Sequence, residues 1–257
     1  MRVMMIGDVI GRPGREAVTR LVPALRDEYA IDLVVANGEN SAGGIGITPD
    51  TAHELLSAQV DVITSGNHIW KKKEIIPFLK EEMPVLRPAN YPPGSPGRGF
   101  INLGDVIVVN LMGRVFMEAL DCPFREADRI LNEVKGPNAP KIVLVDFHAE
   151  ATSEKQAMAW YLAGRVSAVV GTHTHVPTAD TRIIADRTAF VSDLGMVGPR
   201  DSVIGVNAAP VIEKFLTQMP RSFDVASGPV MFNSVLIDID ASTGRATAIQ
   251  RLDRQVD

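Results

Sequence analysis

Four of the five histidines in this chain directly follow short apolar runs, and their spacing could support metal or proton-transfer chemistry. His148 follows KIVLVDF, His173 and His175 follow SAVVGT, and the pair Asn67 and His68 follows DVITSG. Imidazole nitrogens and amide oxygens bind first-row metal ions, and imidazole also transfers protons near neutral pH. These residues could therefore form a metal centre, a proton-transfer site, or both.

Acidic residues occupy the same position after two earlier apolar runs. Asp8 follows MMIG, and Glu39 and Asn40 follow LVVANG, whereas the fifth histidine, His53, lies within a helical pattern. Taken singly, such residues have ordinary explanations, because an isolated histidine usually makes a loop hydrogen bond and Asp or Asn often caps a helix. Separate roles do not explain why acids, amides and imidazoles recur after five runs. We therefore predict one shared site.

The types of ligand restrict the metal. Cys122 is the only cysteine and does not belong to this set, which excludes a thiolate zinc finger and an iron–sulfur cluster. Two carboxylates, amide oxygens and three imidazoles suit manganese, iron, zinc or cobalt. Six or seven ligands exceed what one ion with an open position needs. We therefore predict two divalent ions about 3.5–4 Å apart, the arrangement of two-metal phosphoesterases.

Strand and helix patterns alternate between these residues. Val- and Ile-rich runs of strand length are separated by amphipathic segments, which predicts mostly parallel strands with right-handed crossovers. The carboxyl ends of parallel strands lie at one edge of a sheet, so the polar residues would converge there. The predicted strands are 2–7, 31–37, 61–66, 105–113, 141–148 and 165–173, and the predicted helices are 15–29, 49–59 after Thr48, 73–82, 124–135, 154–163 after Ser153, and 207–218.

The pattern changes after residue 180 to strands joined by short turns. The segment 88–99, PANYPPGSPGRG, is the one stretch dense in Pro and Gly, and it predicts a surface loop. We expect an open α/β sheet joined to an antiparallel one, within a single domain over residues 1–257. The later predicted strands are 181–186, 188–193, 230–240 and 244–253, the last two forming a hairpin across ASTG.

Charge and composition restrict the partners. The chain has 257 residues and a formal net charge of −5, which argues against binding of long nucleic acid through phosphate neutralisation. A small anionic substrate is compatible, because a bound metal can reverse the local charge. One cysteine allows no intrachain disulfide, and no apolar run approaches the ~18 residues of a membrane helix. We expect a cytoplasmic protein without a membrane partner, and edge strands leave room for a homo-oligomer.

The order of the motifs resembles the calcineurin-like metallophosphoesterases. An acid follows the first strand and another follows the second, GNH follows the third, and a single His precedes GTHTH. The blocks GDVIGRPGR, NGENSAGGIGIT, SGNHIW, DFHAEATSEK, GTHTHVPTAD and SDLGMVGP resemble the bacterial YmdB-like branch, whose members are cyclic nucleotide phosphodiesterases. The resemblance extends over nearly the whole chain. It implies an αββα sandwich, in which two mixed β-sheets are flanked by helices, and 2′,3′-cyclic nucleotides as substrates.

Two departures from the wider superfamily bear on the ligands. Asp8 is followed by Val9 and Ile10 instead of the usual Asp-x-His, and Glu39 stands where an Asp usually bridges the ions. The YmdB-like branch shares both features. An amide in place of an imidazole favours iron or manganese over zinc or cobalt. By this resemblance, one ion would bind Asp8, Glu39, Asn40 and His175, and the other would bind Glu39, Asn67, His148 and His173.

His68 stands next to the ligand Asn67. In an extended segment successive side chains point in opposite directions, so His68 would face the substrate instead of the ion. Our hypothesis is that a metal-bridging hydroxide attacks phosphorus in line while His68 protonates or stabilises the leaving oxygen. The alternative is that His68 only orients the turn at Asn67. The same alternation, with Thr174 as spacer, would direct His173 and His175 to different ions.

Several points stay open. SAGGIGIT is no phosphate-binding loop of known spacing, but its glycines would let backbone approach a phosphate. Arg12 and Arg15 could contact that phosphate or be solvated, and Asp146 and Glu150 could support His148. No substrate-binding residue is predicted. Other functions compatible with the site are a phosphomonoesterase, a protein phosphatase, or a metal-containing regulatory binding protein.

Overall fold

Two mixed β-sheets form the body of the protein. The computed structural model describes residues 1–80, 83–137 and 139–257. The first sheet has the order β14 (Arg245–Arg251), β13 (Ser234–Asp240), β1 (Arg2–Ile6), β3 (Leu33–Asn37) and β4 (Val62–Thr64). The second has the order β5 (Phe100–Asn102), β6 (Val106–Met112), β7 (Ile142–His148), β8 (Ala168–Thr172), β10 (Thr188–Val191) and β9 (Arg182–Ile184).

The strands that precede site residues all take part in parallel pairing. In the first sheet β1 pairs with β3 and β3 with β4 in parallel, while β13 and β14 are antiparallel. In the second sheet β6, β7, β8 and β10 are parallel, and both edge strands are antiparallel. The predicted hairpin across residues 241–244 is confirmed as the β13–β14 connection. The carboxyl ends of five parallel strands consequently supply the site residues of the next subsection.

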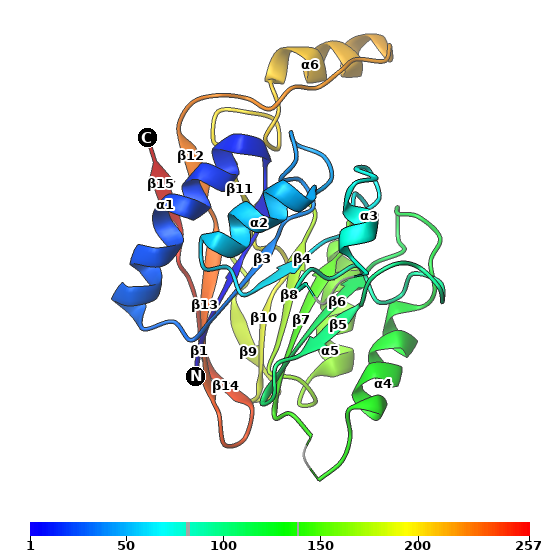
Figure 1. Cartoon of the computed structure of the whole chain (residues 1–257), viewed down its shortest axis with the longest axis vertical. Coiled ribbons are helices and arrows are strands. Elements are labelled where there is room, and N and C mark those ends of the chain that lie inside the picture. Colours follow the sequence, from blue (N-terminus) through cyan, green and yellow to red (C-terminus); the bar gives the residue numbers. More distant parts are fainter. Residues whose placement is uncertain (81–82, 138) are drawn as a thin grey trace.

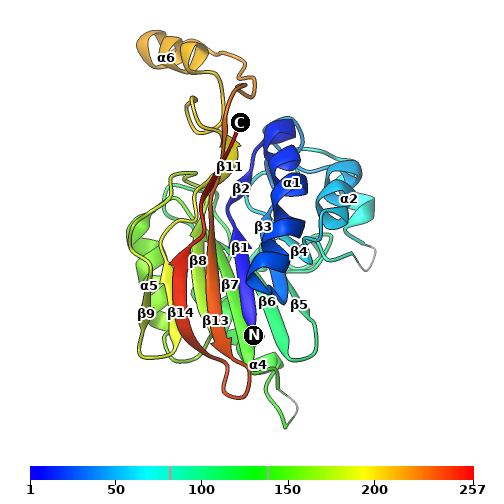
Figure 2. The ribbon, with the colours of Figure 1, turned by 90° about the vertical axis from the view of Figure 1, so that its left-hand side faces the viewer.

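Three apolar layers hold the sandwich together. Alternate strand residues face opposite layers, so Val3 and Met5 of β1 pack with Val108 and Leu144 between the two sheets. The outer face of the first sheet packs on α1 (Gly11–Tyr29) and α2 (Pro49–Ser57). The outer face of the second packs on α4 (Pro123–Glu133) and α5 (Thr152–Leu162). Figure 2 shows α1 and α2 on one side of the molecule and α5 on the other, which confirms the αββα arrangement.

A third, four-stranded sheet was not predicted. It contains β15 (Arg254–Val256), β12 (Val230–Phe232), β11 (Met196–Pro199) and β2 (Asp8–Val9). The strand predicted over 230–240 divides at Asn233, so β12 joins this sheet while β13 stays in the first. Beyond it the chain forms an arm, residues 200–227, that carries α6 (Ala208–Thr217). Figures 1 and 2 show α6 standing off the body of the protein.

Helix boundaries were predicted less accurately than strands. Thr48 caps α2 through its side chain as expected, but α1 begins at Gly11, four residues before the predicted start. The N-cap of α5 is Ala151 and not Ser153. The helix predicted over 73–82 is reduced to α3 (Ile75–Phe78), and residues 81–82 lie outside the described residues.

Two further expectations concern exposure. The loop 88–99 is irregular as predicted, but the surface prediction is wrong for its first four residues, 88–91, which are buried. Asn90 explains this burial, because its side chain donates to the carbonyls of Met112 and Asp121 and ties the loop to the end of β6. Within the described ranges, no helix has both the length and the hydropathy needed to cross a bilayer.

Candidate metal centre

The structure brings the predicted metal ligands together at one end of the sandwich. Side-chain atoms of Glu39, His148 and His173 all lie within 4.8 Å of one another, a spacing that could hold a metal ion. Asp8, Glu39 and His148 have an exposed fraction of 0%. The seven residues follow β1, β3, β4, β7 and β8, and they are Asp8, Glu39, Asn40, Asn67, His148, His173 and His175.

The centre of the first cluster is the Nε2 atom of His148. It lies 3.0 Å from Oε1 of Glu39, 3.1 Å from Oδ1 of Asn67 and 3.0 Å from Nδ1 of His173. All three of these atoms carry lone pairs, so at most one of them can be satisfied by a proton on Nε2. The convergence of four such atoms is the pattern expected around a cation.

The protonation of His148 is set from its other nitrogen. Nδ1 lies 2.9 Å from Oγ1 of Thr172, and that hydroxyl lies 2.7 Å from Oδ1 of Asp146. A hydroxyl has one proton to donate, and the Asp146 carboxylate takes it, so Thr172 accepts from Nδ1–H of His148. In the neutral ring the lone pair is therefore on Nε2 and faces Glu39, Asn67 and His173. Burial raises the pKa of Asp146 to about 6, which still leaves the carboxylate the main form at neutral pH.

The pKa shifts within this cluster also indicate a site for a cation. Burial alone would lower the pKa of His148, but the charge and hydrogen bond of Glu39, together with the charges of Asp8 and Asp146, outweigh burial and raise the pKa above its usual value. Conversely, burial alone would raise the pKa of Glu39, and the charges of His148 and His68 lower it. Burial and the charge of His148 lower the pKa of His173 to about 3. Glu39 is therefore an anion that needs positive charge beside it.

A second cluster adjoins the first through Glu39. Nε2 of His175 lies 3.6 Å from Oδ1 of Asp8 and 3.2 Å from Nδ2 of Asn40, which in turn lies 3.5 Å from Oε1 of Glu39. Oδ1 of Asp8 is buried and has no hydrogen-bond partner among the described residues. A buried carboxylate oxygen without a partner is costly unless a cation is present. The residues present therefore fit the predicted two-ion site, with Glu39 between the two clusters.

In this second cluster burial disfavours the charged forms of both Asp8 and His175, but the attraction between the two charges is larger than the combined effect of burial. The charges of His175 and His148 hold the pKa of Asp8 well below its usual range despite burial. Burial alone would lower the pKa of His175, but Asp8 raises it to about 9. In the metal-free protein a proton on His175 consequently takes the place of a cation.

The turn after β8 separates His173 from His175 by a different means than expected. The strand ends at Thr172, and the two histidines have φ values of 103° and 64°. The prediction of an extended, alternating segment is therefore wrong, because a turn of left-handed residues directs the two rings. Asp193 holds this turn: its Oδ2 accepts from the backbone N and Oγ1 of Thr174, at 3.1 and 2.7 Å.

Asp193 in turn is held by Lys155. Nζ of Lys155 lies 2.6 Å from Oδ2 of Asp193, and the two side chains are 3% and 2% exposed. Sequence reasoning missed both residues. Asp193 ends the predicted strand 188–193 and so stands at the same position as the ligands, whereas a buried Lys155 on a helix gives no signal in the sequence.

The far nitrogen of each histidine in this turn also has a partner. Nε2 of His173 lies 3.2 Å from Oε2 of Glu150, and Nδ1 of His175 lies 2.9 Å from the carbonyl oxygen of Ile204. Ile204 has a φ of 46°, which is strained for a β-branched residue. Such partners fix which ring nitrogen faces a metal. The arm residues 200–227 therefore contribute directly to the orientation of His175.

His68 lies beside the second cluster and not within either. Residues 67–70 form a turn, so the extended geometry predicted for Asn67 and His68 is wrong, yet their side chains do reach different partners. Nδ1 of His68 is 2.7 Å from Oδ1 of Asn40, and its backbone N donates to Oε2 of Glu39 at 2.9 Å. The side chain is 27% exposed. Burial lowers the pKa of His68 below its usual value.

The two arginines near the N-terminus are engaged elsewhere. Arg12 pairs with Glu16 at 2.6 Å on the exposed face of α1. Arg15 pairs with Glu54 and donates to the carbonyl of Ser41, next to the predicted ligand Asn40. In this structure Arg15 supports the turn after β3, and neither guanidinium reaches the ligand atoms.

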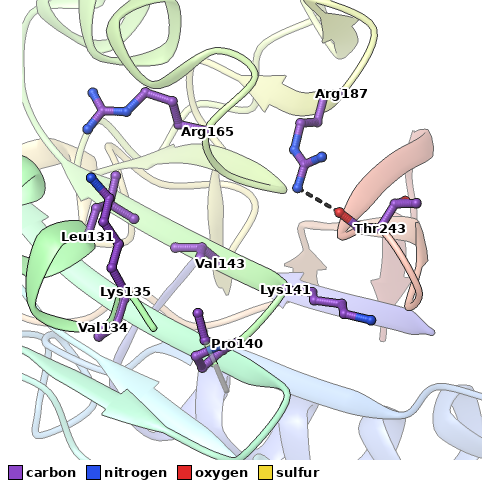
Figure 3. A pocket seen from close by; sticks show the side chains of 10 residues that line it. Leu131, Val134, Lys135, Pro140, Lys141, Val143, Arg165, Arg187 and Thr243 are labelled. Carbon is purple, nitrogen blue, oxygen red and sulfur yellow. Dashed lines mark hydrogen bonds between the residues drawn. The ribbon is translucent and has the colours of Figure 1, made fainter. Parts of the chain in front are cut away.

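A separate cavity of about 480 Å³ lies near the β13–β14 turn, at the opposite end of the sandwich from α6. Figure 3 shows that the side chains of Arg165 and Lys141 point to opposite sides and that Arg187 donates to Thr243. Arg165 is further paired with Asp128 at 2.5 Å. Because these cations do not converge, we assign no function to this cavity.

Comparisons with known proteins agree with this geometry. A 2′,3′-cyclic-nucleotide 2′-phosphodiesterase of Bacillus subtilis (strain 168) is 45% identical over 256 residues, covering 98% of this chain and 96% of that protein. The structure of a hypothetical protein from Thermus thermophilus is 45% identical, with a TM-score of 0.92 and 99% of each chain covered. That of a novel phosphatase from Mycoplasma pneumoniae is 30% identical, with a TM-score of 0.92 and coverage of 99% and 93%. The model of the family described as YmdB-like protein matches residues 4–252, and the chain therefore belongs to the YmdB-like family.

Proposed function

We propose that the chain is a dinuclear metal-dependent phosphodiesterase that hydrolyses 2′,3′-cyclic nucleotides to nucleoside monophosphates. The observation that carries the proposal is the convergence of lone-pair atoms from Glu39, Asn67 and His173 on Nε2 of His148. The activity named for the Bacillus subtilis relative supplies the substrate class. Maintaining the fold does not require two carboxylates and three imidazoles so close together, and a metal centre does.

The ligand sets proposed for the two ions follow the two clusters. Asp8, Glu39, Asn40 and His175 would hold one ion, and Glu39, Asn67, His148 and His173 the other. When bound, the ions would neutralise the phosphate and make a water molecule acidic enough to act as the nucleophile. The oxygen-rich first set favours iron or manganese over zinc or cobalt.

Asn40 couples the first ion site to His68. The amide lies between His175 and His68, with its nitrogen toward His175 and its oxygen toward Nδ1 of His68. An amide oxygen has two lone pairs, so Oδ1 of Asn40 can accept from Nδ1–H of His68 and still offer the other lone pair to an ion. The imidazolium form of His68 then carries its second proton on Nε2, the nitrogen that can face the substrate.

The role proposed for His68 is that of general acid. The new P–O bond forms to the water oxygen, and the bond from phosphorus to one ribose oxygen breaks. As the imidazolium, His68 donates its Nε2 proton to that departing oxygen and becomes neutral. The attacking water releases one proton to solvent, and His68 takes one back for the next turnover. Its partial exposure of 27% permits both contacts. The product is an open monoester, so no further reactant is consumed.

The proposal is tested with purified protein reconstituted with manganese or iron. Hydrolysis of adenosine 2′,3′-cyclic phosphate, a linear diester and a monoester is measured with and without chelator. We expect the cyclic diester to be preferred and all activity to disappear with chelator. Glu39→Gln, which removes the shared ligand charge, is the matched inactive variant. Preference for the monoester would instead identify a phosphomonoesterase. Full function of Glu39→Gln in binding a protein partner, without esterase activity in the wild type, would identify a regulatory protein.

A further inference from the structure

A cavity of about 520 Å³ adjoins the candidate metal centre. Asn40, His68 and His175 line its inner end, so it opens onto the second cluster and onto the proposed general acid. Its outer walls come from the turn after β3 and from the arm of residues 200–227. Its volume lies within the range of about 300–1,000 Å³ typical of small-molecule sites.

The outer walls are apolar and aromatic although they face solvent. Ile45 is 41% exposed, Ile204 50%, Phe215 72% and Phe223 37%. All four line this one cavity. Large apolar side chains that gather on a surface beside a polar site indicate a binding surface. These four side chains do not serve to pack the arm on the body of the protein, because each remains substantially exposed.

The arm is built against the site and not attached to it loosely. The carbonyl of Ile204 accepts from His175 at 2.9 Å, and a Cβ added to Gly44 would lie 2.8 Å from the Val225 side chain. Gly44 has a φ of 91°, which only glycine adopts readily. The loop and the arm thus approach each other closely, and the cavity between them is a defined shape.

The charges of this cavity suit an anionic substrate. Its lining includes Lys214 and no acidic residue, although the chain has a net charge of −5. Nζ of Lys214 lies 5.1 Å from the ring centre of Phe223, so a cation and an aromatic face stand at the same wall. Aromatic rings stack on nucleobases without strong preference for the base.

The cavity on the other side of the ligands fits a nucleobase less well. It measures about 340 Å³ and is lined by Asn67, Phe116, Met117, Glu118 and His173. The carboxylate of Glu118 lines it, and that of Glu150 lies 3.2 Å from His173. It has one aromatic side chain, Phe116, which is 89% exposed.

We infer that the cavity between the turn after β3 and the arm binds the nucleobase of the substrate, with Phe215 and Phe223 as the stacking side chains. This inference rests on the proposed function, because it places the base next to a phosphate held at the metal centre. The arm is then a specificity element that distinguishes nucleotides from other cyclic phosphodiesters.

The test compares a substrate that has a base with one that lacks it. kcat/KM is measured for adenosine 2′,3′-cyclic phosphate and for methyl riboside 2,3-cyclic phosphate. We define the ratio as kcat/KM for the adenosine substrate divided by kcat/KM for the methyl riboside substrate. In Phe215→Ala and in Phe223→Ala we expect this ratio to fall about tenfold, the loss typical when a stacking ring is removed. Leu216→Ala is the matched control, since Leu216 is on the same helix, is 80% exposed and does not line the cavity. Its ratio should equal that of the wild type.

Three results would overturn the inference. The first is an unchanged ratio in both phenylalanine variants. The second is a fall in Phe116→Ala, which would place the base in the cavity on the other side. The third is a change of molecular mass in Phe215→Ala by light scattering, which would assign the exposed face to contact with a second copy.

A binding measurement separates this inference from the proposed function. Calorimetry with adenosine 3′-monophosphate and ribose 3-phosphate requires no turnover. The base site is supported if the wild type binds the nucleotide more tightly than the sugar phosphate and Phe215→Ala loses this difference. That support holds even if the wild type hydrolyses neither cyclic substrate. Absence of hydrolysis would contradict the proposed function but not the base site. Equal binding of both monoesters by the wild type would defeat the base site.

Discussion

Each histidine in the two clusters has one ring nitrogen committed to the protein and the other left for the site. Thr172 takes Nδ1 of His148, Glu150 takes Nε2 of His173, and Ile204 takes Nδ1 of His175. Such pairing fixes the tautomer before any ligand binds. The protein itself therefore sets which nitrogen of each ring faces the proposed ions.

Replacing His68 with Ala should lower kcat by about 10²–10⁴-fold, the usual contribution of a general acid, with metal content unchanged. Because the proposed role needs the protonated imidazole, kcat of the wild type should fall as the pH rises through the pKa of His68. That fall should be absent from the residual activity of His68→Ala. Steady-state kinetics with metal analysis on both proteins tests this. Full turnover in the variant would mean that His68 only orients the turn at Asn67.

Metal binding at pH 7 should release protons. The pKa of His175 is raised to about 9 by Asp8, against the effect of burial, so its ring is protonated at neutral pH in the metal-free protein. A metal must displace that proton, and metal affinity should therefore rise as the pH rises toward 9. Calorimetric titration with manganese in two buffers of different ionisation enthalpy measures the release. Identical heats in both buffers would show that no proton leaves. Asp8→Asn removes the charge that raises this pKa and should reduce the release by His175.

At the scale of elements, the turns after β4 and β8 place three of the proposed ligands, Asn67, His173 and His175. Gly66 ends the run before Asn67, and a Cβ at this position would lie 2.2 Å from Nε2 of His148. Only glycine allows the turn to pass the imidazole so closely.

The Gly66→Ala substitution should consequently displace His148 and weaken binding of the second ion by about 10- to 100-fold, the effect typical of disturbing a ligand's support. Gly136→Ala is the control, because a Cβ there meets no atom within 4 Å. Metal titration of both variants gives the comparison. Equal affinities would show that the imidazole does not need its observed position.

The Lys155–Asp193 pair should be a stability element as well as a support for the turn. Lys155→Met leaves a buried carboxylate without its cation and should lower the free energy of unfolding by about 3–5 kcal/mol. Urea denaturation of the metal-free protein measures this. Arg12→Ala breaks an exposed pair and should cause no detectable change. An unaffected Lys155→Met would mean that Asp193 is neutral or finds another partner.

A double variant separates stability from positioning. Lys155→Met with Asp193→Leu removes both charges and should recover most of the lost stability. It also removes the acceptor that holds Thr174. Metal affinity should then stay low although the fold is stable. Recovery of both properties together would show that Asp193 does not position His173 and His175.

Strands and their ends were predictable, whereas the turns were not. An apolar run followed by a polar residue is visible in the sequence, and β1, β3, β4, β7 and β8 were all predicted on that basis. The turn at His173 and His175 is held by Asp193, which follows a different strand, β10, so the local sequence could not supply its φ values. Likewise, the strand predicted over 230–240 divides at Asn233, where the chain passes from the third sheet to the first.

At the scale of the whole molecule, the sandwich brings two sheets' carboxyl ends to one site. Glu39 and Asn67 follow strands of the first sheet, and His148 and His173 stand at the ends of strands of the second. Asp8 begins β2 of the third sheet, two residues after β1 ends. Apolar residues between the sheets fix the distance across which these ligands meet. The α/β pattern and the resemblance together predicted this arrangement. The helix predicted over 207–218 is confirmed as α6. The third sheet was not predicted, because its strands of two to four residues are too short to show a regular period. Self-association, a single domain and cytoplasmic location stay predictions.

The central claim, that two ions act together on a phosphodiester, is tested most directly by titrating the metal-free protein with manganese while following hydrolysis of adenosine 2′,3′-cyclic phosphate. The two clusters share Glu39, and the account predicts that full activity is reached only at two equivalents of metal per chain. Glu39→Gln should show neither tight stoichiometric binding nor activity. Full activity at one equivalent, or none at two, would contradict the account.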